Sequence, residues 1–132
     1  MRAIGLLALA VSGACTSQPS TTFSEIYPLL FPVETKAQCD FCHGLPTNDI
    51  SNGKLSMGMD RATAYTALRA TSTSSKCGGR PLVVPGDSTS SLLYQKLTSP
   101  PCGGTMPLGG TPLTPEILAK VASWIDGGAQ DD

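Results

Sequence analysis

Two cysteines and one histidine lie within five consecutive residues, Cys39-Asp40-Phe41-Cys42-His43. On a helical turn, residues three positions apart share one face, so both thiols can act on the same group. The imidazole directly after the second cysteine can coordinate a metal ion. These side chains could therefore exchange disulfides, bind zinc, or hold a haem by two thioether bonds with the histidine on its iron.

The order of these residues favours covalent haem attachment, for which C-x-x-C-H is the characteristic pattern. Cys39 and Cys42 would reach the two vinyl groups along one haem edge, and His43 would be the proximal iron ligand. Two alternatives fit less well. A thioredoxin-like pair needs a βαβ context, which the pattern of the chain does not provide. A zinc site would also need Cys77 and Cys102, which are single cysteines far apart rather than a closely spaced pair.

His43 is the only histidine of the chain, so two histidines of one molecule cannot ligate the iron. The sixth ligand would be a methionine, a weaker group, or none. Apart from Met1, the candidates are Met57, Met59 and Met106.

Residues 1–14 are predicted to form a lipoprotein-type signal peptide, cleaved before Cys15. After the basic Arg2, residues 3–11 are apolar over about half of the ~20 residues that span a bilayer. Small residues precede Cys15, which would carry the lipid. The alternative is an ordinary signal peptide that leaves Cys15 as a stray thiol. Residues 15–22 are expected to be a tether and residues 23–132 one folded domain, exported and lipid-anchored at the periplasmic face of a membrane or at the outer membrane.

The five cysteines can all be assigned under this interpretation. Cys15 would carry lipid and Cys39 and Cys42 the haem, which leaves Cys77 and Cys102 as a predicted disulfide. Closing a loop of this length stabilises the folded state by roughly 3 kcal/mol in the chain-entropy model. A free thiol, or a thiolate ligand from Cys102, remains the alternative.

The composition indicates a single domain of short helices and long loops. The chain has 132 residues, 14 glycines and 11 prolines, and its net charge of −1 does not suit a nucleic-acid partner. Aromatic residues make up 5%, so a core built from side chains alone would be thin, and a bound apolar cofactor would complete it.

Capping signals predict where the helices begin. Thr22 and Glu25 have capping-box spacing ahead of an apolar pattern that extends to Leu30. Further helices are expected after Asp60, over residues 91–97 with Asp87 or Ser88 as its start, and after Thr114, where Pro115 suits the first helical position. Together with the turn at 39–43 they predict an all-α fold of four to five short helices with long Pro/Gly-rich loops.

Beyond the haem motif, four segments carry a family signature: Val84-Pro85-Gly86-Asp87, Ser91-Leu92-Leu93-Tyr94-Gln95-Lys96-Leu97, Met106-Pro107-Leu108-Gly109-Gly110 and Trp124-Ile125-Asp126-Gly127-Gly128-Ala129. From about residue 23 to residue 129 the chain resembles the small single-haem class I cytochromes c of bacteria, in their exported lipoprotein form. The resemblance implies a cytochrome c-like fold wrapped around one covalent haem c. It also implies that Met106 is the distal iron ligand, while Met57 and Met59 are expected to pack in the core.

The resemblance implies a single-electron carrier that is not an enzyme and that exchanges electrons with redox protein partners, without a small-molecule substrate. Once Arg2 is removed, 8 basic and 10 acidic side chains leave a charge near −2, so apolar docking is expected.

Trp124, Tyr27 and Arg80 could contact the haem propionates or serve as core and surface residues. Two alternatives remain: a haem peroxidase or gas sensor with a displaceable methionine, and a redox-silent or metal-binding lipoprotein.

Overall fold

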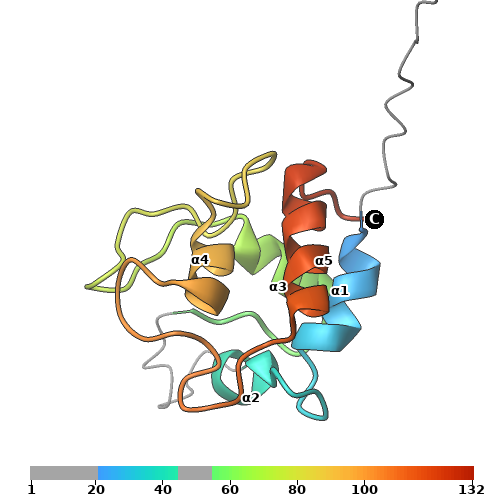
Figure 1. The fold of residues 1–132 in the computed structure, drawn as a ribbon, viewed down its shortest axis with the longest axis horizontal. Coiled ribbons are helices and arrows are strands. Elements are labelled where there is room, and N and C mark those ends of the chain that lie inside the picture. The colour runs from blue at the N-terminus through green and yellow to red at the C-terminus, as the bar shows by residue number, and fades with distance from the viewer. Residues whose placement is uncertain (1–20, 45–54) are drawn as a thin grey trace, which may run out of the picture.

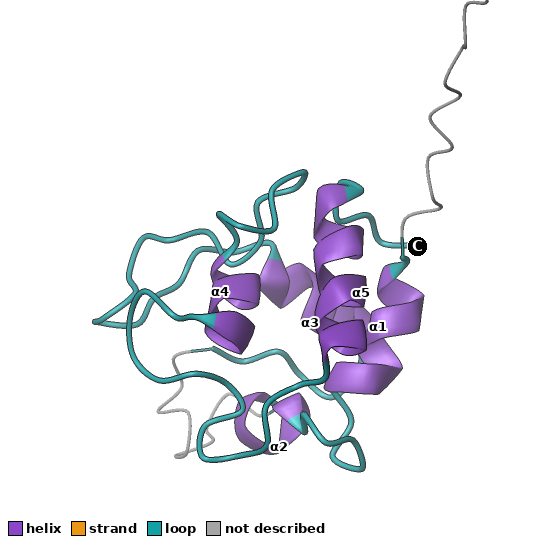
Figure 2. Cartoon of the chain, in the orientation of Figure 1, coloured by secondary structure: helices purple, strands orange, loops and turns teal. Residues whose placement is uncertain are grey.

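The computed structural model describes residues 21–44 and 55–132. Over these ranges the chain forms five helices joined by long loops (Figure 1) (Figure 2). They are α1 (Phe23–Leu30), α2 (Cys39–His43), α3 (Arg61–Leu68), α4 (Leu92–Thr98) and α5 (Pro115–Asp126). These ranges contain no strand, and an isolated antiparallel bridge joins Thr71 to Pro81. The prediction of an all-α domain with four to five short helices is confirmed at this level.

Three helices begin where their capping residues predict. The Thr22 hydroxyl accepts a hydrogen bond from the Glu25 N–H (3.1 Å), and the Glu25 carboxylate accepts one from the Thr22 N–H (2.8 Å), which completes the capping box. Asp60 accepts a bond from the Thr63 N–H at 2.9 Å and starts α3. Thr114 caps α5 in the same way.

The helix predicted over residues 91–97 is confirmed as α4, but the proposed start at Asp87 or Ser88 is wrong, because Ser91 is the N-cap residue. The Asp87 carboxylate instead closes the preceding turn by accepting bonds from the N–H (3.0 Å) and hydroxyl (2.6 Å) of Ser90. Bonds from the Ser90 and Thr89 hydroxyls lower the pKa of Asp87 to about 2. The Ser88 N–H donates to the Asp126 carboxylate on α5 (2.7 Å), so these polar residues attach the loop to α5.

An aromatic cluster around Phe23 holds α1, α3 and α5 together. Phe23 is completely buried, and its ring centroid lies 5.0 Å from that of Trp124 on α5 and 5.3 Å from that of Tyr65 on α3. Phe31, just after α1, meets the same ring edge-on at 6.0 Å. Figure 1 shows these three helices gathered on one side of the molecule, with α4 across from them and α2 at one end.

Residues after α5 return to α1 and α3 and close this cluster. The Phe23 N–H donates to the Asp132 side chain at 2.9 Å, and Tyr65 donates to the carbonyl of Ala129 at 3.0 Å. The indole N–H of Trp124 donates to the carbonyl of Gln130 at 2.9 Å. Trp124 is therefore a buried core residue whose polar atom already has a partner.

The predicted signal peptide and Cys15 lie outside the described residues. The last two residues of the predicted tether contact the helices, because the Thr21 N–H donates to the Ser123 hydroxyl of α5 (3.2 Å) and Thr22 caps α1. Within the described ranges, no helix has the length and apolar character needed to cross a membrane.

Replacing Phe23 by alanine should lower the free energy of unfolding by about 3–5 kcal/mol, because it removes the ring that links three helices. Urea denaturation of the full chain, followed by circular dichroism, measures this change. The matched control is Phe41→Ala, which truncates a phenylalanine that is 58% exposed and should change stability by less than about 1 kcal/mol. Equal losses in the two variants would contradict a core centred on Phe23.

Candidate functional site

A strained turn places α2 at the end of the bundle. Gln38, the residue before the helix, has a left-handed backbone (φ 47°), which costs a non-glycine residue roughly 1–2 kcal/mol. The Gln38 N–H donates to the Thr35 hydroxyl at 3.0 Å, and the Asp40 N–H donates to the carbonyl of Phe31 at 2.9 Å. The first turn of α2 is thus fixed to the chain that leaves the aromatic cluster.

Both cysteines of α2 carry free, partly buried thiols. The side chain of Cys39 packs against the main core. Burial, reinforced by the Asp40 carboxylate, raises the pKa of the Cys39 thiol to about 12. A thiol with this pKa stays protonated at neutral pH, whereas disulfide exchange requires an attacking cysteine with a lowered pKa. Its environment therefore disfavours the thioredoxin-like alternative.

The ring of His43 is oriented by a backbone carbonyl twelve residues away. Its Nδ1 lies 3.0 Å from the carbonyl oxygen of Leu55. A carbonyl oxygen only accepts hydrogen bonds, so Nδ1 carries the proton and the lone pair of the neutral ring is on Nε2. The carbonyl of His43 accepts a bond from the Met57 N–H at 2.6 Å, so two contacts fix α2 to residues 55–57. An imidazole held in this way is prepared to give Nε2 to a metal.

The other side of α2 presents an unusual buried carboxylate. Asp40 is 6% exposed, and its Oδ1 has no hydrogen-bond partner among the described residues. Burial, followed by the repulsion of Asp60 and Glu34, raises the pKa of Asp40. Burial and these two carboxylates thus disfavour the charged form of Asp40.

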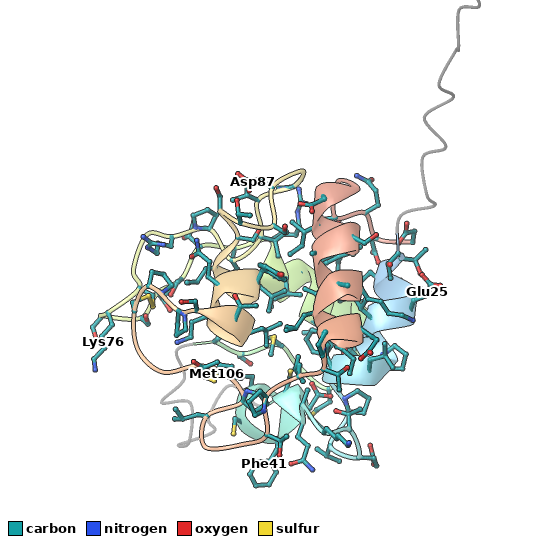
Figure 3. All side chains as sticks on the ribbon, viewed as in Figure 1. Glu25, Phe41, Lys76, Asp87 and Met106 are labelled. Carbon is teal, nitrogen blue, oxygen red and sulfur yellow. A yellow bond between two sulfur atoms is a disulfide. The ribbon has the colours of Figure 1, made fainter. Side chains whose placement is uncertain are left out.

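Met106 lies on the loop between α4 and α5, which we call the Met106 loop (residues 99–114). Its side chain is partly buried and packs against the same core cluster as Cys39 and Leu55. Figure 3 shows Met106 between α4 and α2 in this view, whereas the labelled Phe41 points away from the molecule. Met106 and Cys39 thus both border the main apolar core.

The other two methionines have different environments. Met57 is 3% exposed and lies in the core, as predicted. Core packing is the wrong prediction for Met59, which is 56% exposed. Its neighbour Gly58 has a positive φ of 69°, which turns the chain outward immediately before the Asp60 cap of α3.

Cys77 and Cys102 form a disulfide, with their Cα atoms 5.7 Å apart. It joins the loop before α4 to the Met106 loop, as the cysteine count predicts. Because these sulfur atoms are bonded to one another, neither can complete a zinc site with Cys39 and Cys42, and Cys102 is no thiolate ligand. Across the part of the chain that the structure describes, no cluster of three or more His, Cys, Asp or Glu side chains could hold a metal ion.

Several apolar side chains at the border of the main core are only partly buried. Besides Cys39 and Met106, the core is bordered by aliphatic and aromatic side chains that remain partly exposed: Leu55, Leu93, Tyr94, Ile117 and Leu118. A haem, if bound, would be held by Cys39, Cys42 and His43. The Leu55 carbonyl that orients His43 has no sequence signal, because every residue carries a carbonyl.

The remaining candidates for polar contacts already have protein partners. Tyr27 stacks on Phe31 with ring centroids 5.0 Å apart. The guanidinium of Arg80 donates to the Gln95 side chain at 3.2 Å. These contacts agree with a core role for Tyr27 and a surface role for Arg80, and contact of either residue with a haem propionate stays a prediction.

Replacing Gly44 by alanine should destabilise the site. A Cβ atom at this buried position would lie 2.5 Å from the carbonyl oxygen of Asp40 and 2.4 Å from the sulfur of Met59. Met59 can move away, but the backbone of α2 cannot without distorting the motif, so we expect a loss of about 1–3 kcal/mol. Thermal and urea unfolding of Gly44→Ala and of Gly79→Ala, where a Cβ has open space at a positive φ of 76°, separate the clash from general glycine effects. A loss of stability in Gly44→Ala that is equal to or smaller than the loss in Gly79→Ala would contradict the predicted clash.

The residues that the sequence singles out for chemistry lie on α2 and on the Met106 loop. Comparison of the chain with family models, with curated proteins and with solved structures found no match.

Proposed function

We propose that this chain is a single-electron carrier of the class I cytochrome c type, with one haem attached through Cys39 and Cys42. The orientation of His43 is the observation that carries the proposal. The bond from Nδ1–H to the Leu55 carbonyl reserves Nε2 for iron, and it does so beside two partly buried free thiols.

The thiols would bind the group covalently. Each S–H would add across one vinyl double bond, with the sulfur bonded to one vinyl carbon and the hydrogen to the other, so that no group would leave. Thioether bonds hold the haem independently of the iron's oxidation state.

Met106 is the proposed distal ligand. When bound, the haem supplies a couple between Fe(II) and Fe(III). The soft thioether of Met106 favours the reduced iron and raises the potential relative to a second histidine. With His43 and Met106 as axial ligands, no coordination position remains for a substrate, so we propose electron transfer rather than catalysis. The helices and the long Met106 loop would wrap around the haem.

Partner contact is proposed to occur through apolar surface beside the site. Phe41 on α2 and Leu108 on the Met106 loop are 58% and 72% exposed. Exposed apolar side chains next to a redox centre suit brief contact with another redox protein. A lipid on Cys15 would anchor the exported carrier to a membrane surface, where it would meet membrane-bound redox partners.

The mass of the unfolded chain tests the attachment. Protein matured with haem-attachment machinery should, after unfolding and solvent extraction, weigh more than its processed chain and lipid by one whole haem and retain Soret absorbance. The Cys39→Ser, Cys42→Ser double variant should lose both signals. A wild-type chain without added mass and without Soret absorbance would refute the proposal.

Replacing Met106 by alanine tests the distal ligand. Because the thioether is lost, the low-spin spectrum should become mostly high-spin, the far-red methionine–iron band should vanish, and the reduction potential should fall. Spectroscopy and a redox titration measure these changes, with Met59→Ala as the control for loss of an exposed methionine. A spectrum unchanged in Met106→Ala would shift ligation to Met57 or Met59.

A further inference from the structure

The side chain of Lys96 extends into the Met106 loop instead of into solvent. Lys96 belongs to the last turn of α4, and its ammonium donates hydrogen bonds to two loop carbonyls, those of Cys102 (3.0 Å) and Gly104. Lysine carries three donors, so one ammonium can serve both acceptors. The partly buried position lowers the pKa of Lys96 through desolvation, in agreement with an ammonium enclosed by protein.

The backbone of Lys96 makes a third contact with the same loop. Its carbonyl accepts a bond from the N–H of Met106 at 2.7 Å. One residue of α4 therefore binds the loop at residues 102, 104 and 106, and the last of these contacts lies on the backbone of the methionine itself.

The loop is shaped to admit the ammonium. Gly103 has a positive φ of 65°, and a Cβ atom there would lie 3.2 Å from Nζ of Lys96. The backbone of residues 102–104 can curve around the ammonium because this position has no side chain. The Cys77–Cys102 disulfide fixes the start of this curve to a separate part of the chain.

We propose that Lys96 is a positioning residue, which holds the Met106 loop so that the thioether is presented at a fixed place. This inference rests on the proposed role of Met106 as an iron ligand. The loop contains glycines at positions 103, 104, 109 and 110, so its backbone has many accessible conformations unless other contacts restrict it. The disulfide restricts one end, and Lys96 restricts the stretch between Cys102 and Met106.

The test uses the full haem-loaded chain and the variant Lys96→Met, which keeps the length of the side chain and removes its donors. Lys120→Met is the matched control, because Lys120 is an exposed lysine on α5 and the charge change is the same. Amide hydrogen exchange of Met106 and the far-red methionine–iron band are measured, together with covalent haem content and thermal unfolding.

In Lys96→Met, we expect Met106 amide exchange to accelerate at least about tenfold, since charged hydrogen bonds that protect the loop are lost. The far-red band should lose more than half of its intensity, while the haem content equals that of wild type. Lys96→Arg, which keeps the charge and donors, should recover part of the band. Lys120→Met should match wild type in each measurement.

Exchange and far-red absorbance in Lys96→Met that equal those of Lys120→Met would overturn the inference, as would a lowered unfolding temperature with both local signals intact. If Lys96→Met does not fold, Lys96→Gln, which is too short to reach both carbonyls, is judged by the same criteria. Absence of covalent haem in wild type would refute the proposed function instead, and Met106 exchange would still report whether Lys96 holds the loop.

Discussion

The packing of Phe23 against Trp124 is the interaction on which the remaining structure depends. The two rings, 5.0 Å apart, join α1 to α5, and Tyr65 adds α3 to the same contact. Five of the seven aromatic residues of the chain take part in this cluster, where large rings bury much apolar area per side chain. Phe31 extends the cluster toward α2, because its ring meets Phe23 while its carbonyl accepts the Asp40 N–H. Phe31 therefore connects the aromatic core directly to the Cys39–His43 motif.

The candidate site is assembled from short pieces that would have little stability alone. The five residues of α2 are far below the length at which an isolated helix forms in water. The helix is held from one side by Phe31 and from the other by residues 55–57, through the ring and the carbonyl of His43. The Met106 loop is likewise fixed by a disulfide and by Lys96. A disulfide and specific hydrogen bonds thus hold these short segments in place against the longer helices.

The surroundings of Cys39–His43 disfavour two of the three chemistries that this motif could perform. A reactive dithiol would need a lowered thiol pKa, but the surroundings of Cys39 raise it. Zinc would need further ligands, but the other two described cysteines are bonded to each other. Haem attachment uses an imidazole and two free thiols, and α2 carries an imidazole held by a backbone carbonyl together with two free, partly buried thiols. The proposal of an electron carrier follows from that combination.

The sequence alone determined the local features: the C-x-x-C-H spacing, the capping residues Thr22, Asp60 and Thr114, and the single cysteine pair left over. These were predictable because capping and spacing depend on residues within one or two turns. Only the tertiary structure decided the contacts between distant segments. It directed the His43 ring to the Leu55 carbonyl, turned Met59 outward, used Asp87 for a turn, and carried Lys96 into the Met106 loop. Each of these depends on where a backbone group lies in space, and backbone groups are the same at nearly every position of a chain.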